Sequence, residues 1–271
     1  MVEVPVSTLE IIFKQVPLLE ESHPRDFDIN PLPGFSNHSW HLKNDQHDWV
    51  LRIPKQETNQ YINRRYEAHN ASIANSLGIA PNCVWRNESG LSLSVTVPDS
   101  RSFNTNDIEI ESVLGELLKT ISRLHKSKIN FLGAVNLTEL LPRYYQQIPE
   151  HLKSQIETSY KLAMAKLEGL SVKEKMLVPS HNDLVLENIL IDAAGQIWLI
   201  DWEYSSMASP YWDLATLSNA AKLDQTQCAW LLAEYGKHYL TLVPEILFDY
   251  RYMLDVLSTC WMAAFGENEG T

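Results

Sequence analysis

Four short strand-like runs of apolar and alternating residues lie within the first hundred positions of the chain. Asn44–Gln46 separates the first two runs and Asn87–Gly90 separates the last two, and residues of these types favour tight turns. The pattern therefore predicts two β-hairpins, with strands at Ser39–Lys43, Trp49–Pro54, Asn82–Arg86 and Leu91–Val97.

Elsewhere the apolar residues recur at the spacing of a helix. One stripe runs from Ile110 to Leu124, and Asn106 with Glu109 is expected to form a capping box at its start. A second predicted helix, residues 58–77, stops at Gly78 and has an apolar face made of Ile62, Tyr66, Ile73 and Leu77. The other predicted helices are Thr8–Leu19, Glu150–Glu168, Pro210–Lys222, Gln225–Leu240 and Pro244–Phe265.

These elements predict an α+β protein with two lobes. A small lobe of antiparallel sheet and helix covers residues 1–98, and a larger, mainly helical lobe covers residues 99–271. The larger lobe contains one non-helical segment, Val178–Ser206, with short strands at Ile189–Ile191 and Ile197–Ile200. We expect a ligand cleft between the two lobes, which is where such sites commonly form.

Charge and composition narrow the classes of partner. The 271 residues include 22 basic and 34 acidic side chains, a formal net charge of −12, which disfavours nucleic acid or an anionic membrane because phosphates would be repelled. Residues 99–271 contribute 14 basic and 23 acidic side chains, so most of the surplus lies in the second lobe. Three scattered cysteines, no secretory signal pattern and no apolar run of ~20 residues predict a reduced, cytoplasmic protein.

The densest candidate chemistry lies in Ser180–Asn188 and Ile200–Tyr204. Closing the hairpin between them brings Asn188 and Asp201 to one rim, near Asp183. Carboxylate and amide oxygens on such a rim are ligands that Mg²⁺ prefers, and a further carboxylate can accept the proton of an attacking hydroxyl. Phosphoryl transfer from a nucleotide needs this set. An isolated Asp or Asn beside a strand is ordinarily a turn residue, but here the residues occur together and in order.

Two neighbouring residues are interpreted as structural support. His181 is expected to be a buried hydrogen-bonding support for the Asp183 loop, since the sequence has no zinc-ligand spacing. Asp213, four residues into its predicted helix, is expected to brace the same loop.

These motifs resemble the choline kinase and aminoglycoside phosphotransferase superfamily, most closely bacterial choline kinases and thiamine kinases. The resemblance covers residues 28–265 and implies a bilobal, protein-kinase-like fold with ATP and Mg²⁺ as cofactors. The matching segments are His181–Asp183 with Asn188, Ile200–Tyr204, Trp212–Ala215, the loop Leu32–Asn37, the strand Trp49–Pro54 and the helix start Ile62–Glu67.

In the second lobe, the resemblance implies that Asp183 orients the substrate hydroxyl and acts as the catalytic base. Asn188 and Asp201 would hold Mg²⁺. Glu187 stands where many relatives have glycine, so the sequence departs from the family pattern directly before Asn188.

In the first lobe, the resemblance implies that Arg52 contacts the nucleotide phosphates and is positioned by an ion pair with Glu67. A guanidinium can grip phosphates bidentately, which gives this role a physical basis. Ser36 and Asn37 would lie over the phosphates, and Val95–Pro98 would flank the adenine. The alternative for Arg52 and Glu67 is an ordinary surface pair, but Arg52 lies in an otherwise apolar strand.

The expected substrate is a small cationic alcohol. Glu203 and Tyr204 directly follow Asp201, and a carboxylate beside aromatic faces suits a quaternary ammonium or thiazolium cation. Choline and thiamine fit this description equally well. Trp261 is the third residue that we assign to the substrate. The other aromatics of this lobe, taken one by one, are expected to be core residues: Trp212, Tyr250, Tyr252 and Phe265.

The sequence disfavours three alternative functions. The loop has a single glycine and Asp201 is followed by Trp202, not Phe-Gly, so the sequence disfavours a protein kinase. An aminoglycoside-type phosphotransferase would need more carboxylates for its polycationic substrate. A non-catalytic nucleotide-binding protein would ordinarily lack one of Asp183, Asn188 and Asp201. The sequence predicts no particular oligomeric state.

Overall fold

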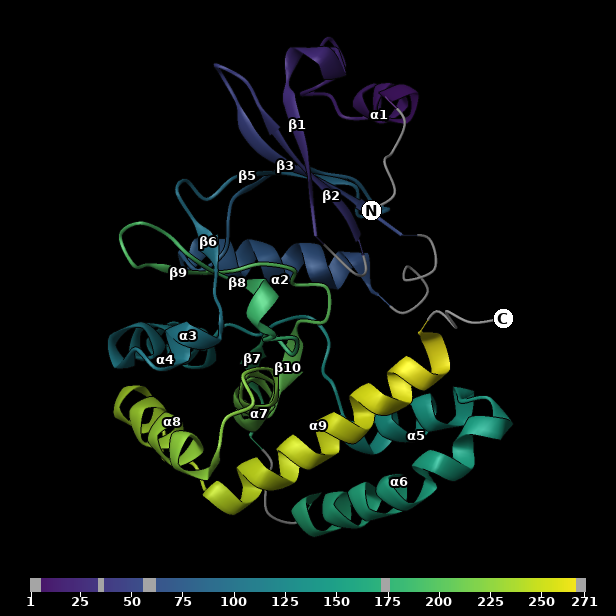
Figure 1. Ribbon diagram of the computed structural model, residues 1–271, viewed down its shortest axis with the longest axis vertical. Coiled ribbons are helices and arrows are strands. Elements are labelled where there is room, and N and C mark those ends of the chain that lie inside the picture. Colours follow the sequence, from purple (N-terminus) through teal and green to yellow (C-terminus); the bar gives the residue numbers. More distant parts are fainter. Residues whose placement is uncertain (1–5, 34–36, 56–61, 172–175, 267–271) are drawn as a thin grey trace. The chain divides into compact units, whose positions relative to one another are not determined.

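A computed structural model describes residues 6–33, 37–55, 62–171 and 176–266 (Figure 1). The chain divides into two compact units, Met1–Asp99 and Ser100–Thr271. Across the described residues, no helix has the length and apolar character needed to cross a membrane.

The first unit is built on a five-stranded antiparallel sheet with the strand order β1-β2-β3-β5-β4. Both predicted hairpins, β2–β3 and β4–β5, are confirmed. β1 was not predicted because its residues are mostly exposed and carry no apolar pattern. The strands are β1 Asp28–Leu32, β2 Asn37–Lys43, β3 Asp48–Pro54, β4 Cys83–Arg86 and β5 Ser92–Val95.

The two faces of this sheet differ in character, because successive residues of a strand project to opposite sides. One cross-strand row is apolar and packs against helix α1 (Val6–Phe13): Trp40, Leu51, Leu93 and Trp85. The neighbouring row is polar: Ser39, Arg52, Ser92 and Arg86. The sheet therefore presents its core on one face and charged groups on the other.

Helix α1 is shorter than predicted, ending at Phe13 instead of Leu19. Beyond the end of α1, the N–H of Val16 donates to the carbonyl of Phe13 at 3.1 Å, and the N–H of Leu19 donates to the carbonyl of Val16 at 2.8 Å. These are tight turns three residues apart. Pro17 has no N–H to continue an α-helical ladder, which explains the early end.

Helix α2 covers Arg64–Ser76, with Asn63 as its N-cap, and the chain turns away at Gly78 with φ of 69°. Its predicted start falls partly on residues 58–61, which lie outside the described residues. The predicted apolar face was wrong: the buried residues of α2 are Glu67, Asn70 and Ala74. Burial here follows an ion cluster, which hydrophobic spacing does not reveal.

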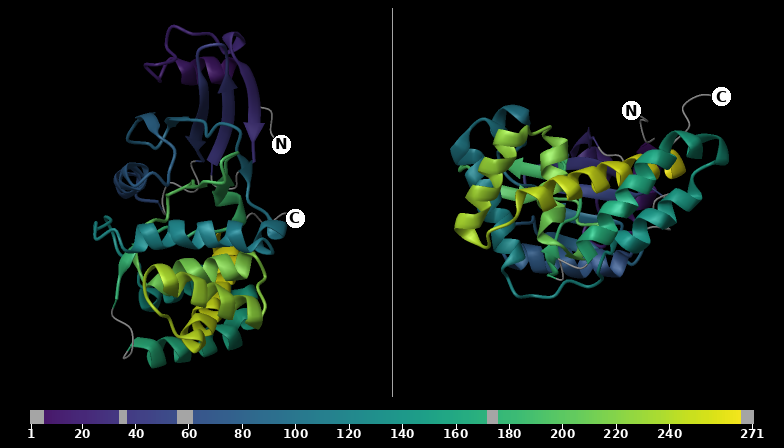
Figure 2. Two further views of the ribbon diagram at one scale, coloured as in Figure 1. Left: turned by 90° about the vertical axis from the view of Figure 1, so that its left-hand side faces the viewer. Right: turned by 90° about the horizontal axis from the view of Figure 1, so that it is seen from below.

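The second unit is mainly helical. Helix α9 packs against α5, α6 and α7, and Figure 2 shows it as the long yellow helix crossing its neighbours. The predicted helices after residue 150 are confirmed within a few residues at their ends. The helices are α3 Thr105–Ile108, α4 Glu111–His125, α5 Leu137–Gln147, α6 Glu150–Ser171, α7 Pro210–Ala220, α8 Gln225–His238 and α9 Pro244–Phe265.

Two helix predictions in this unit need correction. The expected cap at Asn106 with Glu109 was wrong; Asn104 and Asp107 form a capping box at the start of α3, and α4 begins separately at Glu111. Helix α5 was not predicted at all. It contains Pro142, and an internal proline normally argues against a helix because it removes a backbone donor.

Small strands of the second unit carry the candidate chemistry. β8 (Ile189–Ile191) and β9 (Ile197–Leu199) form the predicted hairpin, and β6 (Arg101–Ser102) adds a third strand beside β8. β7 (Val178–Ser180) pairs with β10 (Ser206–Ala208) in a separate ladder. The candidate residues lie on the segments that connect these two small sheets.

Candidate active site

The loop from β7 to β8 carries Asp183 and Asn188. Nδ2 of Asn188 donates to both the main-chain oxygen and Oδ2 of Asp183, each at 2.9 Å. The N–H of Ile200 donates to the carbonyl of Asn188 at 3.0 Å, which extends the β8–β9 ladder by one pair. Asp201 follows directly. The structure therefore brings Asp183, Asn188 and Asp201 together at one end of the hairpin.

His181 lies completely buried beneath this loop. Its Nε2 contacts the carbonyl of Ile200 at 2.9 Å, and its Nδ1 accepts the N–H of Asp183 at 3.3 Å. A carbonyl only accepts, so Nε2 carries the proton. Burial lowers the pKa of His181, which favours the same neutral ring. These contacts tie the loop to the strand end before Asp201.

Asp213, at the start of α7, is fully buried and holds the backbone of the same loop. Its carboxylate accepts the N–H groups of His181 at 2.9 Å and Asn182 at 2.7 Å. His125 Nε2 contacts it at 3.1 Å, and Nδ1 of His125 lies 2.8 Å from the hydroxyl of Tyr235. Burial alone would raise the pKa of Asp213, but the hydrogen bonds from His125 and from the N–H of His181 hold it below its ordinary value.

Three carboxyl groups lie close to one another in this site. Burial raises the pKa of Asp183 to about 7, and the negative charges of Asp201 and Glu203 add to that shift. The hydrogen bond from Asn188 opposes it only in part. Glu203 itself is buried. Such a concentration of negative charge would be relieved by a cation.

An aromatic group lies beside these carboxyls. Burial, followed by the charges of Glu203 and Asp183, raises the pKa of Tyr204, and Tyr144 is close enough to contribute. The Tyr144 ring meets that of Phe265 edge-on at 5.5 Å between centroids, and Phe265 meets Trp261 at 6.2 Å. Tyr144, Phe265 and Trp261 thus form one chain of ring contacts, and Tyr204 interacts electrostatically with Tyr144. Tyr144 was missed because it lies on the unpredicted helix α5.

Three other aromatics of this unit, Trp212, Tyr250 and Tyr252, contact neighbouring elements. Trp212 donates its indole N–H to the carbonyl of Asn182 at 3.0 Å. Tyr250 stacks on Tyr211 with 5.6 Å between ring centroids. The hydroxyl of Tyr252 lies 3.4 Å from the carbonyl of Ser159. The prediction that these are core residues is confirmed for Trp212, which is buried, whereas Tyr250, Tyr252 and Phe265 are only partly buried.

The first unit contains a buried charge cluster centred on Glu67, whose side chain is only 1% exposed. Arg52 and Arg86 contact its Oε1, and Arg64 donates to Oε2 at 2.8 Å. Burial would raise the pKa of Glu67, but the charges of Arg52 and Arg86, with Arg64, lower it to about 2. The expected Arg52–Glu67 ion pair is present, whereas Arg64 and Arg86 were not predicted to join it.

Of the two residues expected over the phosphates, the structure describes one. Asn37 is the first residue of β2, and its side chain is buried. Ser36 lies outside the described residues.

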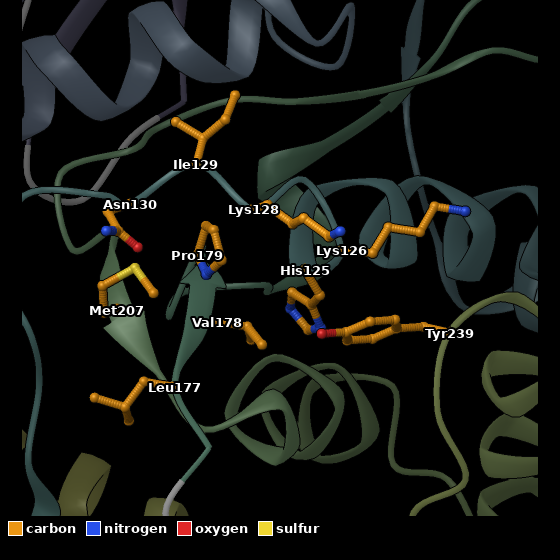
Figure 3. Close-up of a pocket in the computed structure, with 10 residues that line it drawn as sticks. All are labelled: His125, Lys126, Lys128, Ile129, Asn130, Leu177, Val178, Pro179, Met207 and Tyr239. Carbon is orange, nitrogen blue, oxygen red and sulfur yellow. The ribbon is translucent and has the colours of Figure 1, made fainter.

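A pocket of about 380 Å³ occurs elsewhere in the second unit (Figure 3). Residues at and after the end of α4, on β7 and β10, and after α8 surround it. None of them is a predicted site residue. His125, one of the lining residues, also contacts Asp213, which holds the Asp183 loop. The pocket therefore adjoins the support of the Asp183 loop and not its reactive groups.

Comparison with known proteins gives the fold and the family. Protein LicA of Haemophilus influenzae is 26% identical over 285 residues, which span 98% of this chain and 82% of that protein. The crystal structure of choline kinase LicA from Streptococcus pneumoniae superposes with a TM-score of 0.84 at 20% identity, covering 98% and 92% of the two chains. A structure of LicA in complex with AMP gives 0.81 at 20% identity, covering 98% and 91%.

These similarities confirm the predicted α+β fold of the protein-kinase-like type. The phosphotransferase enzyme family, APH, matches residues 28–254 of the chain, in agreement with the resemblance found in its motifs. The protein therefore belongs to the APH phosphotransferase enzyme family.

Proposed function

We propose that this protein transfers a phosphoryl group from Mg-ATP to the hydroxyl of a small cationic alcohol such as choline. The observation that carries the proposal is the convergence of Asp183, Asn188 and Asp201 at one end of a hairpin, next to Glu203 and an aromatic group. The similarity to the structure of choline kinase LicA, and to a structure of LicA in complex with AMP, supports it.

Asp183 is the proposed catalytic base. A carboxylate with a pKa of about 7 can take a proton from a hydroxyl near neutral pH more readily than an ordinary Asp. The two hydrogen bonds from Asn188 orient it, and His181 fixes the backbone on which it stands. Asp213 braces the loop from the other side.

Asn188 and Asp201 are the proposed Mg²⁺ ligands, and their chemistry fits the ion. Because Nδ2 of Asn188 donates to Asp183, the oxygen of the amide is directed elsewhere, and Asp201 adds a carboxylate. No group of three or more His, Cys, Asp or Glu able to hold a metal occurs in the described part of the chain. Phosphate and water oxygens would complete the coordination. Bound Mg²⁺ would neutralise charge on the phosphates.

The first lobe, residues 1–98, is proposed to bind the nucleotide, and residues 99–271 to bind the alcohol and catalyse its phosphorylation. Arg52, held by Glu67, would contact the phosphates, with Ser36 and Asn37 over them. We also propose the cytoplasm as the location, because ATP is available there and the three cysteines are free thiols.

Glu203, Tyr204 and Trp261 are the proposed cation-binding residues; Trp261 contacts Phe265, which contacts Tyr144, and Tyr144 interacts electrostatically with Tyr204. A buried carboxylate beside aromatic rings attracts a quaternary ammonium both by charge and through the ring faces. The extended polycation of an aminoglycoside would need carboxylates spread over a longer surface.

A substrate panel tests the proposal. Purified protein with Mg-ATP is assayed for ADP release with choline, ethanolamine, thiamine and kanamycin. We expect turnover with one of the small cations and little with kanamycin. Preference for kanamycin would support the aminoglycoside alternative. Equal rates with all four would contradict a specific cation site. No turnover, together with ATP binding, would favour a non-catalytic nucleotide-binding protein.

Variants test the assigned roles. Asp201→Asn removes one carboxylate charge with little change in shape, and we expect it to abolish Mg-dependent turnover. Glu203→Gln is expected to raise KM for the cationic alcohol by about ten-fold, since it removes the buried charge facing the cation. Glu187→Gln, which changes an exposed glutamate of the loop between β7 and β8, is the matched control. An unchanged KM in Glu203→Gln would remove that residue from the site.

A further inference from the structure

Arg86 lies in the same cross-strand row as Arg52. Arg52 pairs with Ser92 across β3 and β5, and Ser92 pairs with Arg86 across β5 and β4. Directly opposed residues on neighbouring strands project from the same face. Ser92 is small and buried, so it leaves room for both guanidinium groups above it. Both reach Oε1 of Glu67.

Glu67 does not need Arg86 to satisfy its hydrogen bonds. Arg52 donates to Oε1 and Arg64 to Oε2, so each carboxylate oxygen already has a donor. Nη1 of Arg86 is buried and forms an ion pair with Oε1 at 2.7 Å, but it is not oriented to donate a hydrogen bond to any described residue. A buried donor without a bond is costly, and a second guanidinium beside Arg52 adds repulsion.

We propose that Arg86 is a second phosphate-binding residue, which acts together with Arg52 on the polyphosphate of a nucleoside triphosphate. The proposal rests on the nucleotide-binding role proposed for Arg52. The Arg52 and Arg86 side chains are 13% and 15% exposed, so part of each remains accessible on the same face of the sheet. Phosphate oxygens would accept from both guanidinium groups and offset their repulsion.

This arrangement predicts that the Arg52 and Arg86 side chains bind the polyphosphate of a nucleotide and that their contribution to its affinity does not depend on the nucleobase. Two arginines on one face can bind neighbouring phosphate groups of one ligand. Inorganic tripolyphosphate should therefore bind to the same row without a nucleoside, and inorganic phosphate should bind much more weakly.

The test compares Arg86→Met and Arg86→Lys with the wild-type chain. Arg25→Met, an exposed arginine of the same unit, is the matched control. KM is measured for Mg-ATP and for the alcohol, and the melting temperature is measured with and without tripolyphosphate. Loss of a charged hydrogen bond should raise KM for Mg-ATP about ten-fold or more in Arg86→Met, with a much smaller change in KM for the alcohol.

We also expect Arg86→Met to lose most of the stabilisation by tripolyphosphate, Arg86→Lys to keep part of it, and Arg25→Met to match the wild type. Normal KM for Mg-ATP and normal stabilisation in a folded Arg86→Met protein would overturn the proposal and leave Arg86 a structural partner of Glu67. Absence of any tripolyphosphate effect in the wild type would overturn it as well. If no alcohol is phosphorylated but the Arg86-dependent stabilisation is present, the proposed function fails and this inference stands.

Discussion

Two carboxyl groups of this protein show how neighbours decide the effect of burial on a pKa. Burial and two nearby carboxylates raise the pKa of Asp183 to about 7. Burial also acts on Glu67, but the charges of Arg52 and Arg86, with Arg64, lower its pKa to about 2. One residue is thereby suited to exchange a proton near neutral pH, and the other keeps its charge under almost all conditions.

Glu67→Gln should lower the free energy of unfolding at pH 7 by about 3–5 kcal/mol, because it removes the charge that compensates buried guanidinium groups. The folded pKa lies below the unfolded value of 4.5, so this stabilisation is present above about pH 4.5 and is lost as pH falls towards 2. Urea unfolding of both proteins at pH 7 and near pH 3 measures it. A difference that does not shrink at the lower pH would contradict the prediction.

At the scale of elements, helices α4, α7 and α8 meet the Asp183 loop through one chain of buried side chains. Tyr235 on α8 contacts His125 on α4, which contacts Asp213 on α7, and Asp213 holds the backbone of His181. Because a carboxylate only accepts, Nε2 of His125 carries the proton, and Nδ1 can accept from the Tyr235 hydroxyl.

Tyr235→Phe should therefore cost about 1–3 kcal/mol of folding free energy, because it leaves Nδ1 of buried His125 without its donor. We also expect kcat to fall more than KM for either substrate, since the change reaches the Asp183 loop through Asp213. Chemical denaturation and steady-state kinetics measure the two effects. Tyr239→Phe, a neighbouring tyrosine, is the control. Equal stability of the two variants would show that the Tyr235 hydroxyl contributes nothing.

The elements that could be predicted from the sequence are those with local signals. Turn residues marked both hairpins of the first unit, and Ser209 with Pro210 marked the start of α7. Long-range contacts left no such signal. His125 and Tyr235 are 110 residues apart, and the buried face of α2 is set by arginines from two strands. Pro142 concealed α5, and with it Tyr144.

At the scale of the whole molecule, most of the acidic surplus belongs to the unit in which the cationic substrate is proposed to bind. Of the net charge of −12, residues 99–271 contribute −9. Glu203, Asp183 and Asp201 are part of that surplus. A field of this sign attracts a cation over distances comparable with the Debye length, about 10 Å at 0.1 M salt.

The KM for a cationic alcohol should therefore rise a few-fold between about 0.05 and 0.5 M KCl, because salt screens this attraction. The measurement uses saturating Mg-ATP at each salt concentration, so that weaker nucleotide binding does not contribute. An uncharged alcohol accepted by the enzyme serves as the control and should show little change. A KM for the cation that is independent of salt would show that the acidic surplus does not assist binding.

The backbone at Asn182 and Asp201 has φ values of 66° and 62°, in the left-handed region. Asn, Asp and Gly adopt this region with little cost, whereas alanine and branched residues are strained there. Replacement of Asp201 by alanine would therefore both remove the carboxylate and strain the backbone, so a loss of activity could not be assigned to the carboxylate alone. Evolutionary substitution at these two positions should therefore be confined to Asn, Asp and Gly in homologues that keep the fold. A single Asp201→Asn substitution would then remove the proposed phosphotransferase activity and leave the fold intact.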